Sequence, residues 1–316
     1  MTITQLEYLV AVDTYRSFVL AAEKCFVTQP TLSMQIQKVE EELDVRIFDR
    51  SKLPVQPTPI GVPILRQARA TLKEYALIAE TVAAFRNEIK GTLRLGIIPT
   101  LAPYLLPQLV SRFTKRYKDI RLEIWEYPTE VIRQQLRQEE LDCGILATPL
   151  NDSQLEEFPI FYESFVVYAS ASHPLSQKKT VKVSDLTPTD VWLLNEGHCM
   201  RNQVLNLCAH KDRQKAIKNL EYNTGSVETL KHMVELNSGW TILPELAVRD
   251  LKEEQLDMVR YFKDPEPVRE ISLLTTRNFI RKTQSDALIR EIQEMLPEKM
   301  LVRSKKTVIG IDSHSL

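Results

Sequence analysis

The residues best suited to chemistry lie in the run EGHCMR, residues 196–201, which contains Gly197, His198 and Cys199. The pattern places Cys199 at the start of a short helix, with Arg201 two residues further on. A helix N-terminus and a nearby cation both favour the thiolate form of cysteine. Because the thiolate is the form that peroxides oxidise to sulfenic acid, we predict that Cys199 is a redox-active residue. The simpler alternative is a cysteine without a role.

Two other cysteines lack these surroundings. Cys25 follows alanines in a predicted helix and Cys143 lies in an apolar strand, so we expect both to be buried packing residues. The sequence has no CxxC pair and no histidines at zinc-finger spacing, and its glycines form no phosphate-binding motif. It therefore predicts neither a metal site nor a cofactor.

Two threonines follow predicted strands. Thr100 comes after a strand at residues 92–98, and Thr129 comes after one at residues 120–127. Open α/β sheets bind ligands at the C-terminal ends of their strands, so both hydroxyls lie where a small ligand would bind. The alternative is that each threonine caps a helix, which suits Thr129 well.

Three helical patterns open the chain. Apolar residues recur at helical spacing over residues 3–12, Ser17 is the predicted N-cap of a second helix, and Thr28 caps a third with Pro30 in its first turn. Only a few residues separate the second and third patterns, which predicts a helix-turn-helix. Residues 45–59 alternate apolar residues with prolines and indicate a short two-stranded wing.

A long apolar stripe over residues 58–90 predicts one helix that buries this face against the same helix of a second subunit. From residue 91 onward, strands alternate with helices, which favours a parallel-type α/β sheet in two lobes. The later part of this pattern predicts strands at residues 165–170, 190–196 and 216–222 and a helix from Val227 to Leu236. The predicted fold is α/β, with several parts. These are a winged helix-turn-helix (1–58), a linker and dimerisation helix (59–90), a regulatory domain (91–300, lobe I 91–163 and 268–300, lobe II 164–267) and a flexible tail (301–316).

Charge does not by itself point to a partner. The chain of 316 residues has a net charge of −1, so nucleic-acid binding would have to come from local geometry. The start of the third helix offers short polar side chains, and the wing carries two cations. The predicted DNA-contacting residues are Gln29, Pro30, Thr31, Ser33, Gln35, Arg50 and Lys52. No apolar run has the length of a membrane span and no signal peptide is evident, so we expect a cytoplasmic protein without a membrane partner.

Taken together, residues 1–300 resemble a LysR-type transcriptional regulator, through residues 6–12, 17–18 with 21–22, 28–33, 43–50, and Thr58 with Gly61. Residues 96–100, 103–107, 141–143 and 196–201, followed by Cys208, resemble the peroxide-sensing members. Asp44 departs from the pattern, because the family usually has glycine there. The resemblance implies a periplasmic-binding-protein-like sensor domain and a tetrameric activator of antioxidant genes.

The resemblance also implies roles at the sensing site. Cys199 would react with hydrogen peroxide and Cys208 would be the resolving thiol, with a peroxide pocket formed by Thr100, Thr129, His198 and Arg201. If residues 199–208 form a helix, the two thiols lie roughly 13 Å apart along its axis. A disulfide needs Cα atoms within about 7 Å, so closing it requires this segment to unfold locally.

The expected partners are double-stranded DNA, hydrogen peroxide as the signal and RNA polymerase, with a homodimer or homotetramer as the assembly. Two alternatives stay open at this point. One is a metabolite-responsive regulator of the same family, with its ligand between the lobes. The other is a thiol peroxidase, although residues 1–90 then have no obvious use. The sequence favours a regulator that is not an enzyme.

Overall fold

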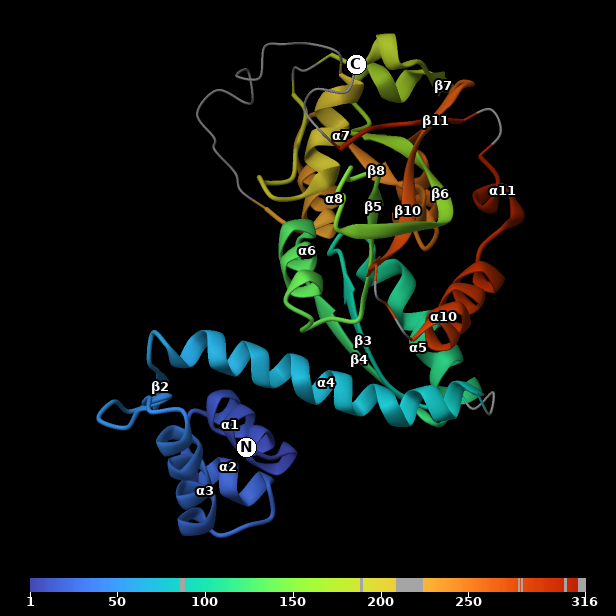
Figure 1. Cartoon of the computed structure of the whole chain (residues 1–316). Helices are drawn as coiled ribbons and strands as arrows, with labels where there is room; N and C mark the ends of the chain where they lie inside the picture. Colours follow the sequence, from blue (N-terminus) through green and yellow to red (C-terminus); the bar gives the residue numbers. More distant parts are fainter. Residues whose placement is uncertain are drawn as a thin grey trace. The chain divides into compact units, whose positions relative to one another are not determined.

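The structure is a computed structural model that describes residues 1–85, 89–187, 190–208, 224–277, 279, 281–303 and 306–311. The chain divides into two compact units, Met1–Glu88 and Ile89–Leu316 (Figure 1). Each unit is considered by itself.

The first unit begins with the three predicted helices, α1 (Ile3–Tyr15), α2 (Phe18–Lys24) and α3 (Gln29–Glu42). Their N-caps are Thr2, Ser17 and Thr28, and each side-chain oxygen accepts a backbone N–H from the first turn. The apolar faces of these helices pack into one core, together with the first half of the long helix that follows. The predicted helix-turn-helix is therefore confirmed.

The wing consists of two short antiparallel strands, β1 (Phe48–Asp49) and β2 (Gln56–Pro57). It is joined to α3 by Glu40, whose buried carboxylate accepts the backbone N–H groups of Ile47 and Phe48 at 2.7 and 3.2 Å. Asp44 takes a left-handed conformation with φ 50°, which glycine adopts more readily than aspartate.

Helix α4 spans Gly61–Phe85. The Thr58 hydroxyl accepts the Gly61 N–H at 3.0 Å, and Pro63 lies in the first turn, where its missing N–H has no intrahelical partner to lose. Leu65 and Ala68 are buried in the core of the first unit. Further along α4, Tyr75, Ile78 and Val82 are exposed.

The second unit is built on one large sheet with strand order β4-β3-β5-β10-β6-β9-β7. Strands β4, β3 and β5 are parallel, whereas β10 is antiparallel to both β5 and β6. The expected parallel pattern is therefore present in β4, β3 and β5 only, and the sheet as a whole is mixed. The strands are β3 (Gly91–Ile97), β4 (Ile120–Glu126), β5 (Cys143–Thr148), β6 (Leu155–Ala169), β7 (Thr180–Val181), β8 (Trp240–Pro244), β9 (Val259–Phe262), β10 (Glu266–Thr276) and β11 (Lys306–Val308).

Helices cover this sheet in both lobes (Figure 1). They are α5 (Ala102–Arg116), α6 (Thr129–Arg137), α7 (Cys199–Leu207), α8 (Val227–Leu236), α9 (Glu253–Leu256), α10 (Lys282–Met295) and α11 (Glu298–Leu301). Short 3-10 helices lie at Pro174–Gln177, Val183–Asp185 and Glu245–Val248.

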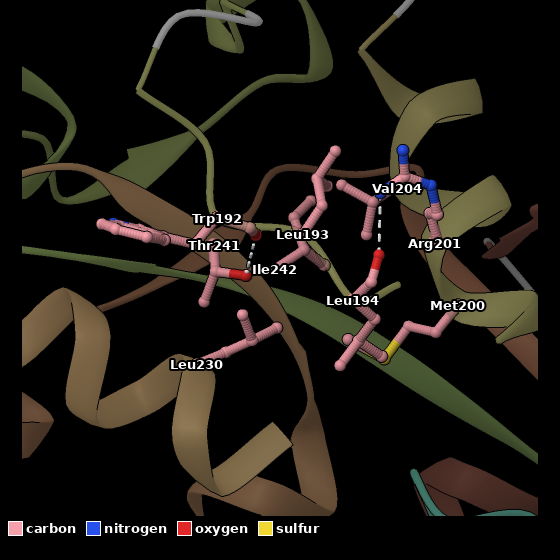
Figure 2. A pocket seen from close by; sticks show the side chains of 9 residues that line it. All are labelled: Trp192, Leu193, Leu194, Met200, Arg201, Val204, Leu230, Thr241 and Ile242. Carbon is pink, nitrogen blue, oxygen red and sulfur yellow. Dashed lines mark hydrogen bonds between the residues drawn. The ribbon is translucent and has the colours of Figure 1, made fainter. Parts of the chain in front are cut away.

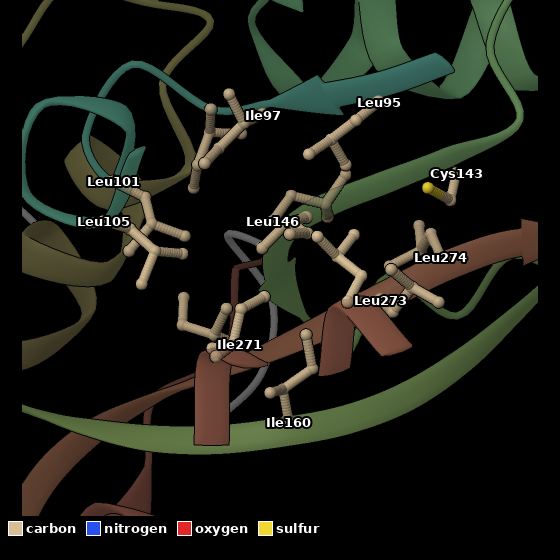
Figure 3. Close-up of a cluster of buried hydrophobic side chains, with 14 of the residues drawn as sticks. Leu95, Ile97, Leu101, Leu105, Cys143, Leu146, Ile160, Ile271, Leu273 and Leu274 are labelled. Atoms are coloured by element: carbon tan, nitrogen blue, oxygen red, sulfur yellow. The ribbon is translucent and has the colours of Figure 1, made fainter. Parts of the chain in front are cut away.

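Strands β6 and β10 run through both lobes, and the apolar core divides along them. Phe161 on β6 packs in the lobe I core, which Figure 3 shows between β3, β5 and β10, whereas Phe165 packs in the lobe II core. Between the two cores, Glu163 on β6 is paired across the ladder with Arg269 on β10. The two-lobed architecture is thus confirmed, and its boundary carries a charged pair.

Some expected elements differ. The apolar run at residues 190–196 forms only an isolated bridge between Val191 and Trp240, and residues 165–170 are the end of the much longer strand β6. The expected strand at residues 216–222 lies outside the described residues. Where a flexible tail was expected from residue 301, β11 pairs in parallel with β10. In the described parts of the chain, no helix combines the length and apolar composition needed to cross a membrane.

Candidate redox site and nucleic-acid interface

Cys199 lies where the two lobes meet. It is the first residue of α7 in lobe II, and its Sγ donates a hydrogen bond to Thr129 Oγ1 at 2.9 Å. Thr129 is the buried first residue of α6 in lobe I, and the N-cap of that helix is Pro128. The capping alternative for Thr129 is therefore wrong, because its hydroxyl bonds to the cysteine. The start of each helix is held against the other by this contact.

A buried cation lies behind this contact. Arg269 is fully buried, and its guanidinium binds the Glu163 carboxylate at 2.7 and 2.8 Å. It also donates to the Thr100 hydroxyl at 2.9 Å and to the Thr100 carbonyl oxygen at 3.1 Å. The other Glu163 oxygen accepts the Leu246 N–H at 2.8 Å. Thr129 thus contacts Cys199 directly, whereas Thr100 is bonded to Arg269.

The surroundings of Cys199 have opposing effects on the pKa of its thiol. Burial raises the pKa of the thiol above its usual value, and the nearby Glu130 acts in the same direction. The hydrogen bond with Thr129 and the positive charge of Arg269 lower this pKa, but the net shift is upward. The pKa of the thiol is therefore raised, whereas the sequence predicted surroundings that favour the thiolate.

Arg201 is not the cation that acts on this thiol. Its guanidinium donates to the Leu194 carbonyl oxygen at 2.8 Å, and Figure 2 shows it beside an apolar gap in lobe II. The side chains of α7, α8 and β8 around it leave no space for a water molecule. The predicted influence of Arg201 on Cys199 is thus wrong; Arg269 supplies the positive charge.

His198 is the N-cap of α7. Its ring lies against Gly225, where an added Cβ would come within 2.8 Å of Nε2. Burial lowers the pKa of His198, so the imidazole is neutral near pH 7. A larger residue at position 225 would displace the ring that precedes Cys199.

Cys208 lies at the other end of α7, where it forms the C-cap and is buried in the lobe II core. Burial raises the pKa of its thiol to about 11. The helix is continuous between the two cysteines, and all four cysteines of the chain are free thiols. Cys143 is fully buried in lobe I as predicted, whereas Cys25 is only half-buried, contrary to the prediction. Burial raises the pKa of both thiols.

Arg269 and Glu163 are two residues of this site that were not predicted from the sequence. Glu163 is followed by Ser164 and Arg269 by Glu270, so neither is a single charge within an apolar run, and no local signal identified them. Their pairing depends on the register between β6 and β10, because the two residues are 106 positions apart in the chain.

The predicted DNA-contacting residues of α3 differ in exposure. Gln29, Pro30 and Thr31 are exposed, and the Thr28 and Thr31 hydroxyls bond to each other at 2.8 Å. Gln35 is half-buried and accepts a hydrogen bond from the side chain of Gln5 at 3.0 Å. The exposed N-terminal turn of α3 therefore presents polar side chains outward, as base and phosphate recognition requires.

The two wing cations have different surroundings. Arg50 bonds to Ser33 Oγ at 3.2 Å and Glu40 Oε2 at 3.3 Å, and its guanidinium lies 4.9 Å from the Phe18 ring centre. Lys52 is exposed and lies 3.8 Å from Asp49. Arg50 is thus fixed against α3, whereas the side chain of Lys52 remains accessible to a DNA phosphate.

A winged helix-turn-helix joined to a two-lobed sensor domain is the arrangement of LysR-type regulators. Residues 3–62 match the bacterial regulatory helix-turn-helix protein, lysR family, and residues 86–297 match the LysR substrate binding domain. The chain belongs to the LysR family of bacterial transcriptional regulators. This is a family of DNA-binding regulators rather than a class of enzymes.

Similar proteins within the family carry more specific names. The chain is 38% identical to a hydrogen peroxide-inducible genes activator of Haemophilus influenzae, over 87% of this chain and 90% of that protein. It is 36% identical to the DNA-binding transcriptional dual regulator OxyR of Escherichia coli, over 87% and 89%. A full-length OxyR variant from Pseudomonas aeruginosa has a similar structure, with a TM-score of 0.75 and 35% identity over 93% and 98%.

Proposed function

We propose that this protein is a DNA-binding transcription regulator that senses hydrogen peroxide through Cys199. The observation that carries the proposal is the Cys199–Thr129 contact at the lobe boundary, next to the buried charge of Arg269. Relatives named as hydrogen peroxide-inducible genes activators support the choice of signal. A Corynebacterium glutamicum OxyR mutant of similar structure, with a TM-score of 0.63 and 26% identity, has H2O2 bound.

The first chemical step is the oxidation of Cys199. The sulfur attacks one oxygen of hydrogen peroxide, the O–O bond breaks, and the thiol proton leaves with the departing hydroxide as water. Cys199 becomes a sulfenic acid and the peroxide is reduced by two electrons. The hydroxyls of Thr100 and Thr129 and the guanidinium of Arg269 are the groups suited to orient the peroxide and to stabilise the departing oxygen.

The second step joins the two ends of α7. The Cys208 sulfur attacks the sulfenic sulfur, a disulfide forms and a second water leaves. Because an intact helix holds these residues roughly 13 Å apart along its axis, residues 199–208 must unwind. The buried residues of this helix are Met200, Gln203, Val204 and Leu207, so unwinding changes the lobe II core. Such a packing change is large enough to alter subunit contacts.

The first prediction concerns pH. Since the pKa of Cys199 is raised, its rate of reaction with peroxide should increase about tenfold per pH unit from pH 6 to pH 8 and still be rising at about pH 9. Stopped-flow measurement of sulfenic acid formation checks this. Thr129→Val should lower the rate further, because it removes a hydrogen bond that lowers this pKa. A plateau below pH 7 would show that the thiolate is the resting form.

The first unit supplies DNA binding in this proposal. The exposed N-terminal turn of α3 enters the major groove and the wing contacts the adjacent backbone. We further propose that the exposed Tyr75, Ile78 and Val82 of α4 form a dimer contact, and that the assembled dimer or tetramer acts on RNA polymerase in the cytoplasm. These three apolar side chains are exposed in the single chain, and a partner subunit would bury them.

The second prediction compares the two wing cations. Lys52→Ala should weaken binding to every DNA sequence and reduce the salt-dependence slope by about 1, with stability unchanged within about 0.5 kcal/mol. Arg50→Ala should weaken DNA binding and also lower the unfolding temperature, because it removes the Glu40, Ser33 and Phe18 contacts. Filter binding over a salt series and thermal melts separate the two. Equal melting temperatures would mean that the contacts of Arg50 are not stabilising.

The function itself is tested by footprinting the reduced and peroxide-treated protein on its own promoter, with mass spectrometry of the same samples. We expect a changed footprint together with a Cys199–Cys208 linkage. If all four thiols survive one equivalent of peroxide, the metabolite-responsive alternative is favoured. Consumption of many equivalents per subunit would favour a thiol peroxidase.

A further inference from the structure

The last described residues of the chain are bound to the sensor sheet. β11 forms a parallel ladder with β10, with Lys306, Thr307 and Val308 opposite Glu266, Pro267 and Val268. The ladder continues in the Ile309 N–H, which donates to the Val268 carbonyl oxygen at 2.9 Å. Ile311 is buried in the lobe I core. We call residues 306–311 the C-terminal strap.

The strap is bonded directly to α7, the helix that carries both redox cysteines. Gln203 Nε2 donates to the Ile309 carbonyl oxygen and Asn206 Nδ2 donates to the Gly310 carbonyl oxygen, each at 2.9 Å. Gln203 and Asn206 are three residues apart and therefore lie on the same side of the helix. Figure 1 shows the strap strand β11 passing next to α7. The middle of α7 is thus bonded to a segment from far along the chain, whose Ile309 packs against the lobe II core and whose Ile311 is buried in the lobe I core.

Gln203 is fully buried, and its Oε1 has no hydrogen-bond partner among the described residues, although its Nε2 is bonded to the strap. An unpaired buried oxygen destabilises the folded helix relative to an unwound form in which water can reach it. The two strap hydrogen bonds act in the opposite direction. The folding equilibrium of α7 is therefore set partly by a segment about a hundred residues away, at separations of 106 and 104 positions.

We propose that the C-terminal strap is a positioning element that holds α7 helical and so limits the rate of disulfide closure. The inference rests on the proposed function, because closure is its second step. Oxidation of Cys199 needs only the first residue of α7, so removing the strap should leave that step unchanged. Attack of the Cys208 thiol on the sulfenic sulfur, with loss of water, requires the helix to unwind. Gln203 and Asn206 lie between the cysteines, so their bonds to the strap must break first.

The test measures the two steps separately in the full-length protein. Two variants are compared with the wild type: a chain that ends at Arg303, which lacks the strap, and Asn206→Ala. Reduced protein is mixed with one equivalent of hydrogen peroxide; dimedone trapping reports sulfenic acid and mass spectrometry reports disulfide. A hydrogen bond changes an equilibrium by roughly 2- to 12-fold. We expect closure to be about tenfold or more faster in the truncated chain and roughly 2- to 12-fold faster in Asn206→Ala.

The rate of sulfenic acid formation should stay within about twofold in both variants. Three controls accompany them. A chain that ends at Ile311 keeps the strap, Asn202→Ala makes the same change elsewhere on α7, and Ile145→Val destabilises the lobe I core by about 1 kcal/mol. All three should close at the wild-type rate. Faster closure in Ile145→Val would overturn the proposal, because general destabilisation would then explain the effect.

Hydrogen exchange in the reduced protein without peroxide gives an independent readout. Amides of residues 203–208 should exchange about tenfold or more faster when the strap is absent. Unchanged exchange in the truncated chain, or unchanged closure in Asn206→Ala, would overturn the proposal that the strap holds α7 helical. A wild-type protein that forms no sulfenic acid would overturn the proposed function and the role of the strap in closure with it. The exchange result would still report whether the strap holds α7, so the two failures are distinguishable.

Discussion

Replacing Cys199 with serine is expected to abolish the peroxide-dependent change in the DNA footprint. Serine keeps the size of the side chain and can donate to Thr129 as the thiol does, so the lobe contact and the fold should persist. A hydroxyl is not oxidised by peroxide under these conditions, and the reaction rate should fall by at least about a thousandfold. The measurement is a footprint titrated with peroxide, beside a melt of the reduced protein.

Matched controls come from the other cysteines. Cys143→Ala should retain the response, because this thiol is fully buried in the lobe I core and burial raises its pKa. We expect the same of Cys25→Ala, since Cys25 lies outside the sensor unit. A response that persisted in Cys199→Ser but disappeared in Cys143→Ala would show that the sensing thiol is Cys143 in lobe I and not Cys199.

The sequence predicted the first unit well because its signals are local. The N-caps Ser17 and Thr28 and the apolar helix faces act within a few residues, so they can be recognised without knowing the rest of the fold. The same holds for the start of α8, where the Ser226 side chain accepts the Thr229 N–H. The predicted helix from Val227 to Leu236 was therefore correct at both ends.

The sensor site was only half predictable. Cys199 carries a local signal, and Thr129 was identified by its place after a strand, but the contact between them depends on how the two lobes meet. The burial of Cys199 also depends on that contact, so the upward shift of its pKa could not be predicted from the sequence. Mixed strand direction was missed for a similar reason, since β10 returns to the sheet from far along the chain.

Removing one member of the buried pair Arg269–Glu163 is expected to have the largest effect on stability. Both side chains have 0% exposure, so Arg269→Met leaves a carboxylate without its cation, and Glu163→Gln leaves the guanidinium without its anion. Breaking a buried pair in this way typically costs about 3–5 kcal/mol of unfolding free energy. Denaturant unfolding of the reduced protein measures the loss. Arg112→Met is the matched control, because Arg112 is about half exposed and should change stability by about 1 kcal/mol or less.

The double variant Arg269→Met with Glu163→Leu separates the pair from its surroundings. Two apolar side chains leave no buried charge, so the double variant should be more stable than either single variant. Its redox behaviour should still differ from that of the wild type, because Arg269 is the cation that lowers the pKa of Cys199. The pH dependence of sulfenic acid formation should therefore shift to higher pH in Arg269→Met and in the double variant. A restored stability with an unshifted pH profile would show that Arg269 supports the fold of the lobe boundary without tuning the sensor thiol.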